Sequence, residues 1–218
     1  DMVNAVYSDV KITNSTFTRS LSDALDIDIS KAELINNVFI DSGNDAIDLM
    51  TSDAVILGNT ITGSSDKGVS VGEGSRLLAI NTLFSNNGIA VQSKDGSTAT
   101  LYNVDIENNA HALDAYKKNW RYNSGGNIYI YKSRLLNNKK MITADKKSTI
   151  YVYDSYHDKA IRDDRKKPRV RLHKTVSQSD IKKSKVKKLW RYPKEVQQMN
   201  WVEDNWWSFT RPEVRGSS

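Results

Sequence analysis

The segments GNDAIDL, at residues 43–49, and DKGVSVGE, at residues 66–73, indicate how this chain folds. Both place a charged residue before an alternation of aliphatic and polar or small residues, which is typical of a β-strand with one buried face. Similar segments recur along the chain, so these strands belong to a repeat. The related segments are DALDI from Asp23, DAIDL from Asp45, KGVSV from Lys67, NGIAV from Asn87, HALDA from His111 and KMITA from Lys140.

The spacing of these segments predicts the architecture. Their starts lie 22, 22, 20, 24 and 29 residues apart, and a second alternating pattern accompanies them. Short strands in a repeat of about 22 residues, with Asn and Gly between them and no helical periodicity, predict an all-β fold, a right-handed parallel β-helix. We expect its interior to contain Leu25, Ile27, Ile47, Leu49, Val69, Val71, Ile89, Val91, Leu113, Ala115, Ile142 and Ala144.

A file of asparagines is expected at one corner of the coils. Stacked amides bond from layer to layer, and Asn tolerates the left-handed backbone of a tight turn. We therefore predict a structural role for this file. It contains Asn14, Asn37, Asn59 and Asn103, with Thr82, Ser133 and Asp154 in the same place on other coils.

The 29-residue coil contains the additional segment YKKNWRYNSGGN, residues 116–127. Insertions on a solenoid often gather on its binding face. Trp120, Tyr122 and the Gly125–Gly126 pair suit a flexible aromatic flap, and a surface excursion without function is the alternative.

Outward residues of stacked strands are expected to form vertical files with ~4.8 Å between layers. The expected first file is Asp23, Asp45, Lys67, Asn87, His111 and Lys140. The second is Asp26, Asp48, Ser70, Ala90, Asp114 and Thr143, and the third is Asp28, Met50, Gly72, Gln92, Tyr116 and Asp145. Charged side chains at matched positions predict an elongated groove.

Such a groove suits an extended, acidic polysaccharide, because carboxylates bond to sugar hydroxyls and Lys or Arg pair with uronates. Lys67 or His111 is the candidate base for removing a proton next to a uronate carboxylate, with Asp45 and Asp48 as acid or orienting groups. The candidate substrate-binding residues are Glu73, Lys94, Asp95, Asp114, Tyr116, Lys117, Trp120 and Arg121. The alternative is that these charges only keep an exposed β-face soluble.

The segments LSDALDI, GNDAIDL and DKGVSVGE resemble three successive signatures of polygalacturonase-type enzymes in the pectin-lyase-like β-helix superfamily. This resemblance covers residues 1–161 and implies acids at Asp23 and Asp45. The chain departs from the pattern at Asn44, where that family has an aspartate, and at Lys67, where it has a histidine. These departures disfavour glycoside hydrolysis and leave a lyase or an epimerase as the expected enzyme class.

The phrases DKGVSVGEGS and GIAVQSKDGS also resemble β-helix segments of exported bacterial proteins, some of them CotH-associated. That resemblance implies an extracytoplasmic setting, whether secreted, periplasmic or on the cell surface. The chain starts at Asp1 rather than Met, and we expect it to be a piece of a longer protein.

The composition limits cofactors and membrane spans. The absence of cysteine excludes disulfides and thiolate metal sites. No cofactor or metal is expected, with calcium bound by Asp26, Asp28 and Asp48 as the alternative. No run of about 18 apolar residues predicts a transmembrane segment.

The charge is uneven along the chain. Residues 1–158 carry 15 Lys and Arg against 19 Asp and Glu, whereas residues 159–218 carry 17 against 7. We therefore divide the chain into a β-helix, residues 1–161, and a basic, Trp-rich C-terminal extension, residues 162–218. The extension is expected to cap the solenoid or to dock on the rest of a larger protein or on a partner domain, and no known module favours nucleic acid. A second hypothesis is therefore a non-catalytic assembly module that docks through this tail.

Overall fold

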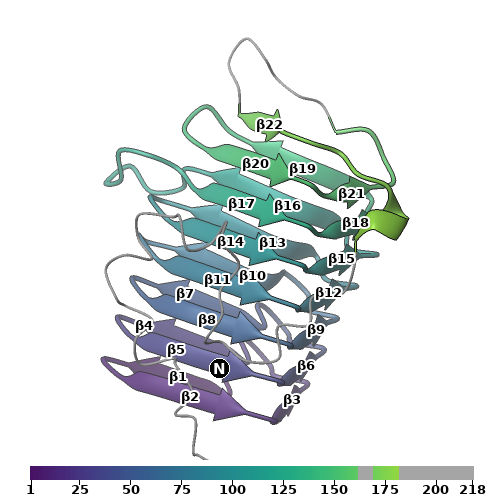
Figure 1. The fold of residues 1–218 in the computed structure, drawn as a ribbon. Coiled ribbons are helices and arrows are strands. Elements are labelled where there is room, and N and C mark those ends of the chain that lie inside the picture. The colour runs from purple at the N-terminus through teal and green to yellow at the C-terminus, as the bar shows by residue number, and fades with distance from the viewer. Residues whose placement is uncertain (162–168, 182–218) are drawn as a thin grey trace, which may run out of the picture. The chain divides into compact units, whose positions relative to one another are not determined.

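Each coil of the chain contributes short strands to three parallel sheets, which we name A, B and C (Figure 1). The computed structural model describes residues 1–161 and 169–181. Every strand pairs in parallel with strands one coil away, so the three sheets together form a solenoid. The predicted all-β solenoid with coils of about 22 residues is thereby confirmed.

Each sheet runs the length of the solenoid. Sheet A contains β1 (Val3–Val6), β4 (Leu25–Asp28), β7 (Ile47–Met50), β10 (Lys67–Gly72), β13 (Ile89–Lys94), β16 (His111–Tyr116) and β19 (Lys140–Ala144). Sheet B contains β2 (Asp9–Thr13), β5 (Lys31–Ile35), β8 (Asp53–Leu57), β11 (Arg76–Ile80), β14 (Thr98–Tyr102), β17 (Asn127–Tyr131), β20 (Thr149–Tyr153) and β22 (Val170–Leu172). Sheet C contains β3 (Thr16–Thr18), β6 (Val38–Ile40), β9 (Thr60–Thr62), β12 (Leu83–Ser85), β15 (Asp105–Glu107), β18 (Arg134–Leu136) and β21 (Tyr156–His157).

The interior is a column of apolar side chains contributed by alternate residues of all three sheets. Sheet C, for example, stacks Phe39, Ile61 and Phe84 in register, each fully buried. Burial of a side chain of this size stabilises the fold by about 1.5–3 kcal/mol. A narrow column is sufficient to stabilise the solenoid, because every hydrophobic layer is covered by the layers of the two neighbouring coils.

The register of β13, the fifth strand of sheet A, differs from the predicted one by two residues. Val69 pairs with Val91, and Lys67 pairs with Ile89. The similarity of GVSV and GIAV suggested that their glycines align. In the structure Gly68 lies opposite Ala90 instead, directly before the paired inward valines. The strands of sheet A therefore keep a constant 22-residue spacing up to the inserted loop. Ile89 lies on the outer face, and Ser93 takes the inward position that was predicted for Val91.

The corner between sheets B and C contains two adjacent files, which the sequence analysis had merged into one. Asn14 and Asn103 have left-handed φ angles of 51° and 52°, as expected for Asn in a tight turn. The following position points inward. There Asn37 accepts the backbone N–H of Ser15 at 2.9 Å, and its amide donates to the carbonyl of Ile12 at 2.9 Å. Of the predicted file, Asp154 belongs to the left-handed positions, and Asn59, Thr82 and Ser133 belong to the inward ladder.

A second asparagine ladder at the corner between sheets C and A was not predicted. Asn109 accepts the backbone N–H of Asn87 at 2.9 Å and donates to the carbonyl of Phe84 at 3.1 Å. Asn138 repeats this bonding one coil later. The prediction that Asn87 belongs to the first outward file is wrong, because its side chain is buried within this corner.

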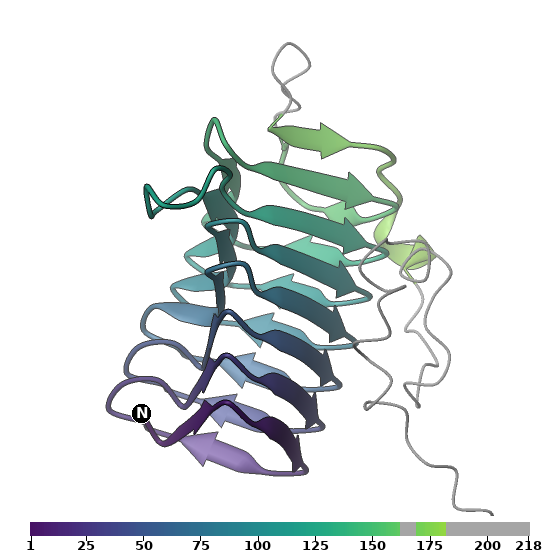
Figure 2. The same ribbon diagram turned by 90° about the vertical axis from the view of Figure 1, so that its left-hand side faces the viewer.

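The loop of residues 117–126 connects β16 to β17 at the corner between sheets A and B (Figure 2). Its glycines are sites of close packing. A Cβ atom on Gly126 would lie 2.0 Å from the carbonyl oxygen of Ser93, and one on Gly125 would lie 2.0 Å from Ser148 Oγ. Gly125 and Gly126 therefore anchor the base of the loop against the neighbouring coils.

Sheet B continues beyond residue 161, because β22 pairs with β20. Its outer face carries an aromatic stack in the last coils. Tyr129 and Tyr151 have ring centroids 4.9 Å apart, and Tyr153 and His173 have centroids 4.2 Å apart. The rings are nearly parallel, so they cover one another's faces.

The predicted division at residues 161 and 162 stays a prediction, and the described chain ends with a 3₁₀ turn, η1 (Gln178–Asp180). The Trp-rich part of the extension, including a short helix expected at residues 193–200, lies outside the described residues. Within the described ranges, no helical segment has both the length and the hydropathy needed to cross a bilayer.

Candidate functional site

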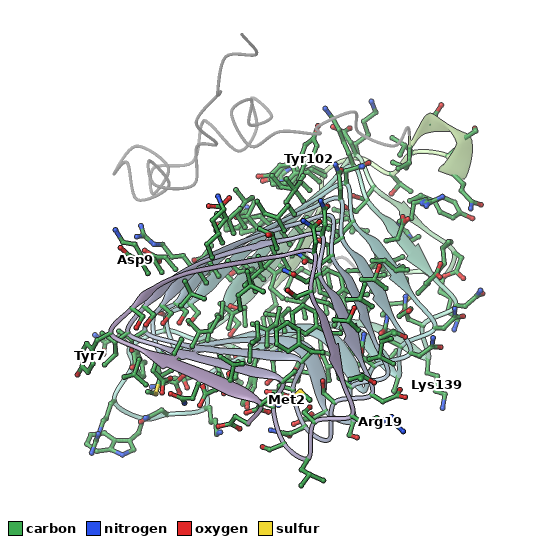
Figure 3. All side chains as sticks on the ribbon, turned by 90° about the horizontal axis from the view of Figure 1, so that it is seen from below. Met2, Tyr7, Asp9, Arg19, Tyr102 and Lys139 are labelled. Carbon is green, nitrogen blue, oxygen red and sulfur yellow. The ribbon has the colours of Figure 1, made fainter. Side chains whose placement is uncertain are left out.

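The outer face of sheet A carries the polar files that the sequence predicted, with the corrected register. The first file is Asp23, Asp45, Lys67, Ile89, His111 and Lys140. The second is Asn4, Asp26, Asp48, Ser70, Gln92, Asp114 and Thr143. The third is Val6, Asp28, Met50, Gly72, Lys94 and Tyr116. Figure 3, a view from below, shows side chains projecting outward from the solenoid.

Asp45 and Lys67 form a buried ion pair in the first file. Asp45 Oδ1 accepts the backbone N–H of Lys67 at 2.9 Å and lies 3.3 Å from Lys67 Nζ, which also contacts Asp66. Burial, opposed by the charge of Lys67, raises the pKa of Asp45 to about 6. Burial alone would lower the pKa of Lys67, but its two carboxylate partners outweigh that effect and raise it. This environment favours the ammonium form of Lys67, which is the opposite of what a general base needs.

Lys94 is also held within the face. Its chain crosses Gly72, where a Cβ atom would lie 2.5 Å from Lys94 Cε, and its Nζ donates to Ser70 Oγ at 3.1 Å. Burial raises the pKa of the adjacent Glu73, although the charge of Lys94 opposes this. Lys94 therefore presents a fixed positive charge at the middle of the face.

His111 lies at the end of a chain of side-chain hydrogen bonds. Gln92 Nε2 donates to Asp114 Oδ2 at 2.9 Å, and the Thr143 hydroxyl donates to Asp114 Oδ1. Thr143 Oγ1 lies 3.1 Å from His111 Nε2. Since Thr143 gives its only proton to Asp114, its oxygen accepts from Nε2–H, and the basic lone pair of His111 is on Nδ1. Burial, opposed by Asp114 and assisted by Lys140, lowers the pKa of the imidazole.

The inserted loop is joined to the edge of this face by two aspartates. The fully buried Asp95 accepts the backbone N–H groups of Lys118 and Asn119 through Oδ1, at 2.7 and 2.8 Å. Asp145 Oδ2 accepts the N–H of Lys117 at 3.0 Å. The carboxylate of Asp95 and the backbone N–H of Lys117, two of the predicted substrate-binding residues, therefore hold the loop in its conformation.

The tip of the loop projects from the solenoid. Trp120 is 83% exposed, and the Arg121 guanidinium lies 5.8 Å from the centre of its ring. Such an exposed aromatic ring next to a cation is suited to contact a ligand or a partner. Tyr116, where the loop departs, is half-buried on the face itself, and burial raises the pKa of its phenol.

The acidic end of the face contains the candidate calcium ligands Asp26, Asp28 and Asp48. Asp26 and Asp48 are in register, and Asp28 lies two residues further along its strand. Burial raises the pKa of Asp26, and the charges of Asp28 and Asp48 raise it further. In residues 1–161 and 169–181, no three His, Cys, Asp or Glu side chains are arranged to hold a metal ion. The calcium alternative therefore gains no support from the geometry.

Several outward side chains of sheet A are packed against one another and are buried, among them Ser70, Gln92 and Lys94. Hollows of about 700 and 640 Å³ lie at the corner between sheets A and B and on the adjoining part of sheet B. The files of sheet A repeat from coil to coil, which is suited to an extended ligand.

These sheets and files agree with the comparison to known families. A family model described as "right handed beta helix region" matches residues 2–161. The chain belongs to the right-handed β-helix family. No curated protein and no solved structure matches the chain significantly. The family match confirms the predicted β-helix, and the CotH-associated resemblance stays a prediction.

The β-helix brings most of the predicted site residues onto one face or its edge. Asp45, Asp48, Lys67, His111 and Asp114 lie in the first two files, and Glu73, Lys94, Asp95 and Tyr116 lie along the side next to the A–B corner. Lys117, Trp120 and Arg121 are on the loop at that corner. The catalytic and binding roles given to these residues stay predictions.

Three residues of the face were not selected from the sequence, namely Gln92, Thr143 and Lys140. Gln92 was placed in the third file, whereas the structure places it in the second, bonded to Asp114. Thr143 and Lys140 were assigned to the correct files, but a threonine and a lysine in a strand gave no sign of their proximity to His111. The spacing of the inward valines, 22 residues from Val69 to Val91, was the signal for the correct register.

Proposed function

We propose that this β-helix binds an extended, acidic polysaccharide along the outer face of sheet A and removes the C5 proton of a uronate unit, as a lyase or an epimerase does. The observation that carries the proposal is the chain from Gln92 through Asp114 and Thr143 to His111. It fixes the tautomer of a buried imidazole whose pKa is lowered. The extracytoplasmic setting implied by the sequence is part of this proposal.

His111 is the better base of the two candidates. Its lowered pKa leaves the imidazole neutral at neutral pH, so Nδ1 is able to accept a proton. Lys67 has the opposite environment, because Asp45 and Asp66 hold its ammonium group. We therefore assign proton abstraction to His111 and give the Asp45–Lys67 pair an orienting role.

Cations next to His111 provide the second requirement of the reaction. Removing a proton next to a carboxylate builds negative charge on that carboxylate, and a positive group beside it lowers the barrier. Lys140 follows His111 in the first file and is exposed. In a lyase, the C4–O4 bond then breaks as the C4–C5 double bond forms, and water supplies the proton to O4. Lys94 and Tyr116 are placed to contact other units of the same chain.

The test is C5 proton exchange and double-bond formation with polygalacturonate and alginate. Exchange of the C5 proton in D₂O measures proton removal by a lyase or an epimerase. Ultraviolet absorbance of the unsaturated uronate detects the lyase reaction alone. We expect His111→Gln to lower either rate by about 100-fold or more, whereas the exposed Lys139→Gln leaves it unchanged. Full activity of His111→Gln would remove the proposed base. Loss of activity in Lys67→Ala but not in His111→Gln would transfer the role to Lys67.

A second candidate function is a non-catalytic assembly module. It is favoured by the internal pairing of Lys67 and Lys94, whose charges are already bonded within the face. A chain shortened after residue 181 separates the two functions. A module that docks through its tail loses its partner, whereas glycan binding by sheet A survives the truncation.

A further inference from the structure

A hollow of about 640 Å³ at the C-terminal end of the solenoid is lined by four cationic side chains, Lys146, Lys147, Arg169 and Arg171. The rest of its lining consists of hydroxyl and amide side chains, among them Ser124 from the inserted loop and Thr149. Among the residues that the structure describes, neither a carboxylate nor an aromatic side chain lines it. This chemistry matches a highly charged anion with several oxygen acceptors.

The fold fixes the positions of these cations. Arg169 and Arg171 flank Val170, whose side chain is 7% exposed and packs against the core. Because side chains alternate along a strand, the two arginines share the opposite face. The backbone of this segment is held by a hydrogen bond from Ile150 N–H to the carbonyl of Arg169 at 2.7 Å. The two lysines lie in the turn before β20, next to Ser148, which accepts the N–H of Gly126 at 3.1 Å.

One described acid, Asp145, interacts electrostatically with Arg169. In residues 1–161 and 169–181, no ion pair joins any of the four cations to a carboxylate. Asp145, the acid that precedes Lys146, is bonded instead to the backbone N–H groups of Lys117 and Lys147, at 3.0 and 2.9 Å. Arg171 is 5.8 Å from the Tyr151 ring, a contact that leaves its guanidinium edge able to bond to oxygen.

We propose that this hollow binds the sulfate or phosphate ester groups of a polyanionic polysaccharide. Two guanidinium forks and two ammonium groups suit tetrahedral oxyanions. Nucleic acid shares the oxyanion, but single strands also need aromatic platforms for their bases. In residues 1–161 and 169–181, no such ring lines the hollow, and the tyrosines of sheet B cover one another. The site is separate from His111 and does not depend on the proposed reaction.

The experiment measures binding of fluorescent dextran sulfate and dextran phosphate to the full chain at fixed, low ionic strength, with neutral dextran and a single-stranded oligonucleotide as further arms. We expect both charged dextrans to bind, and the tighter one identifies the ester. The double variant Lys146→Gln/Lys147→Gln should weaken binding by about 10-fold, because it removes two of the four cations.

The matched control is Arg19→Gln/Lys139→Gln, which removes the same net charge at the corner between sheets C and A (Figure 3). We expect it to change the affinity by less than about 2-fold. His111→Gln should bind the dextrans as the unchanged chain does, which separates this site from the proposed catalytic one. An equal loss in both double variants, tighter binding of the oligonucleotide, or binding of neutral dextran alone would overturn the proposal.

Discussion

Two sets of polar side chains follow the axis of this solenoid and differ in what they bond to. At the corner between sheets C and A, Asn87, Asn109 and Asn138 bond to backbone groups of neighbouring coils. On the outer face of sheet A, Asp114 is bonded by the side chains of Gln92 and Thr143. The comparison teaches that stacked polar side chains have a structural role where they bond to backbone groups. Where they bond to other side chains, they remain available for chemistry.

The largest effect is expected from Asn109→Ala. Asn109 is fully buried, and its loss leaves the N–H of Asn87 and the carbonyl of Phe84 without this partner. Each buried group without a partner costs about 1–3 kcal/mol, so we expect the free energy of unfolding to fall by roughly 3 kcal/mol. Urea unfolding measures this difference.

The matched variant is Gln92→Ala, which removes a buried amide from the face. Gln92 is 5% exposed, and the bond from its Nε2 goes to a side chain. We expect a loss of about 1 kcal/mol. Equal losses in the two variants would erase the distinction between the corner and the face.

Asp45 sharpens the comparison, because it lies on the face but accepts a backbone N–H. Its pKa is raised to about 6 from an ordinary value of 3.8, so the folded state holds the proton more tightly than the unfolded state. The stabilisation is complete below pH 3.8 and is lost as the pH rises through about 6. This loss amounts to about 3 kcal/mol.

The variant Asp45→Asn keeps an acceptor for the N–H of Lys67 but cannot ionise. We expect unfolding curves between pH 4 and 7 to lose this decline, so that the variant is more stable than the unchanged chain at neutral pH. Asp114→Asn, a carboxylate of the same face without a backbone partner, should retain the decline. A decline that persists in Asp45→Asn would assign it to another group.

A smaller effect than those at Asn109 and Asp45 is expected from Thr143→Val, which keeps the shape of the side chain and removes its hydroxyl. Thr143 orients His111, so we expect kcat to fall by about 10-fold with little change in KM. The acidic limb of the pH–rate profile should move to lower pH, because the imidazolium loses the acceptor of Nε2–H. Thr143→Ser should restore both properties. An unchanged profile in Thr143→Val would show that the hydroxyl is only a packing contact.

The sequence was sufficient to predict the fold, because each coil must cover the hydrophobic layer of its neighbours and the pattern repeats many times. It was less informative at β13, where GIAV resembles GVSV and suggested the wrong register. Asn87 was consequently assigned to the face although it lies in a corner ladder. Only the three-dimensional pairing shows which polar residues face the backbone and which face outward.

The candidate site was predicted in part. The sequence placed His111 and Asp114 in two outward files of the same strand. Strict alternation would put residues three apart on opposite faces, and these two share a face because Ala112 and Leu113 are both buried in the core. The sequence did not indicate that Thr143 bonds to both, because the long inserted loop separates Thr143 from them along the chain. The raised pKa of Lys67 also depends on its contacts with Asp45 and Asp66, which no spacing rule reveals.

The long coil that contains residues 117–126 shows that the rise along the axis does not depend on the number of residues in a coil. Leu113 still pairs with Ile142, 29 residues later, as Val91 pairs with Leu113 at 22. A corner therefore accommodates additional residues, and these make new contacts, while the spacing between stacked strands of the face stays at ~4.8 Å. The number of coils, and not the number of residues, therefore sets the length of the outer face of sheet A.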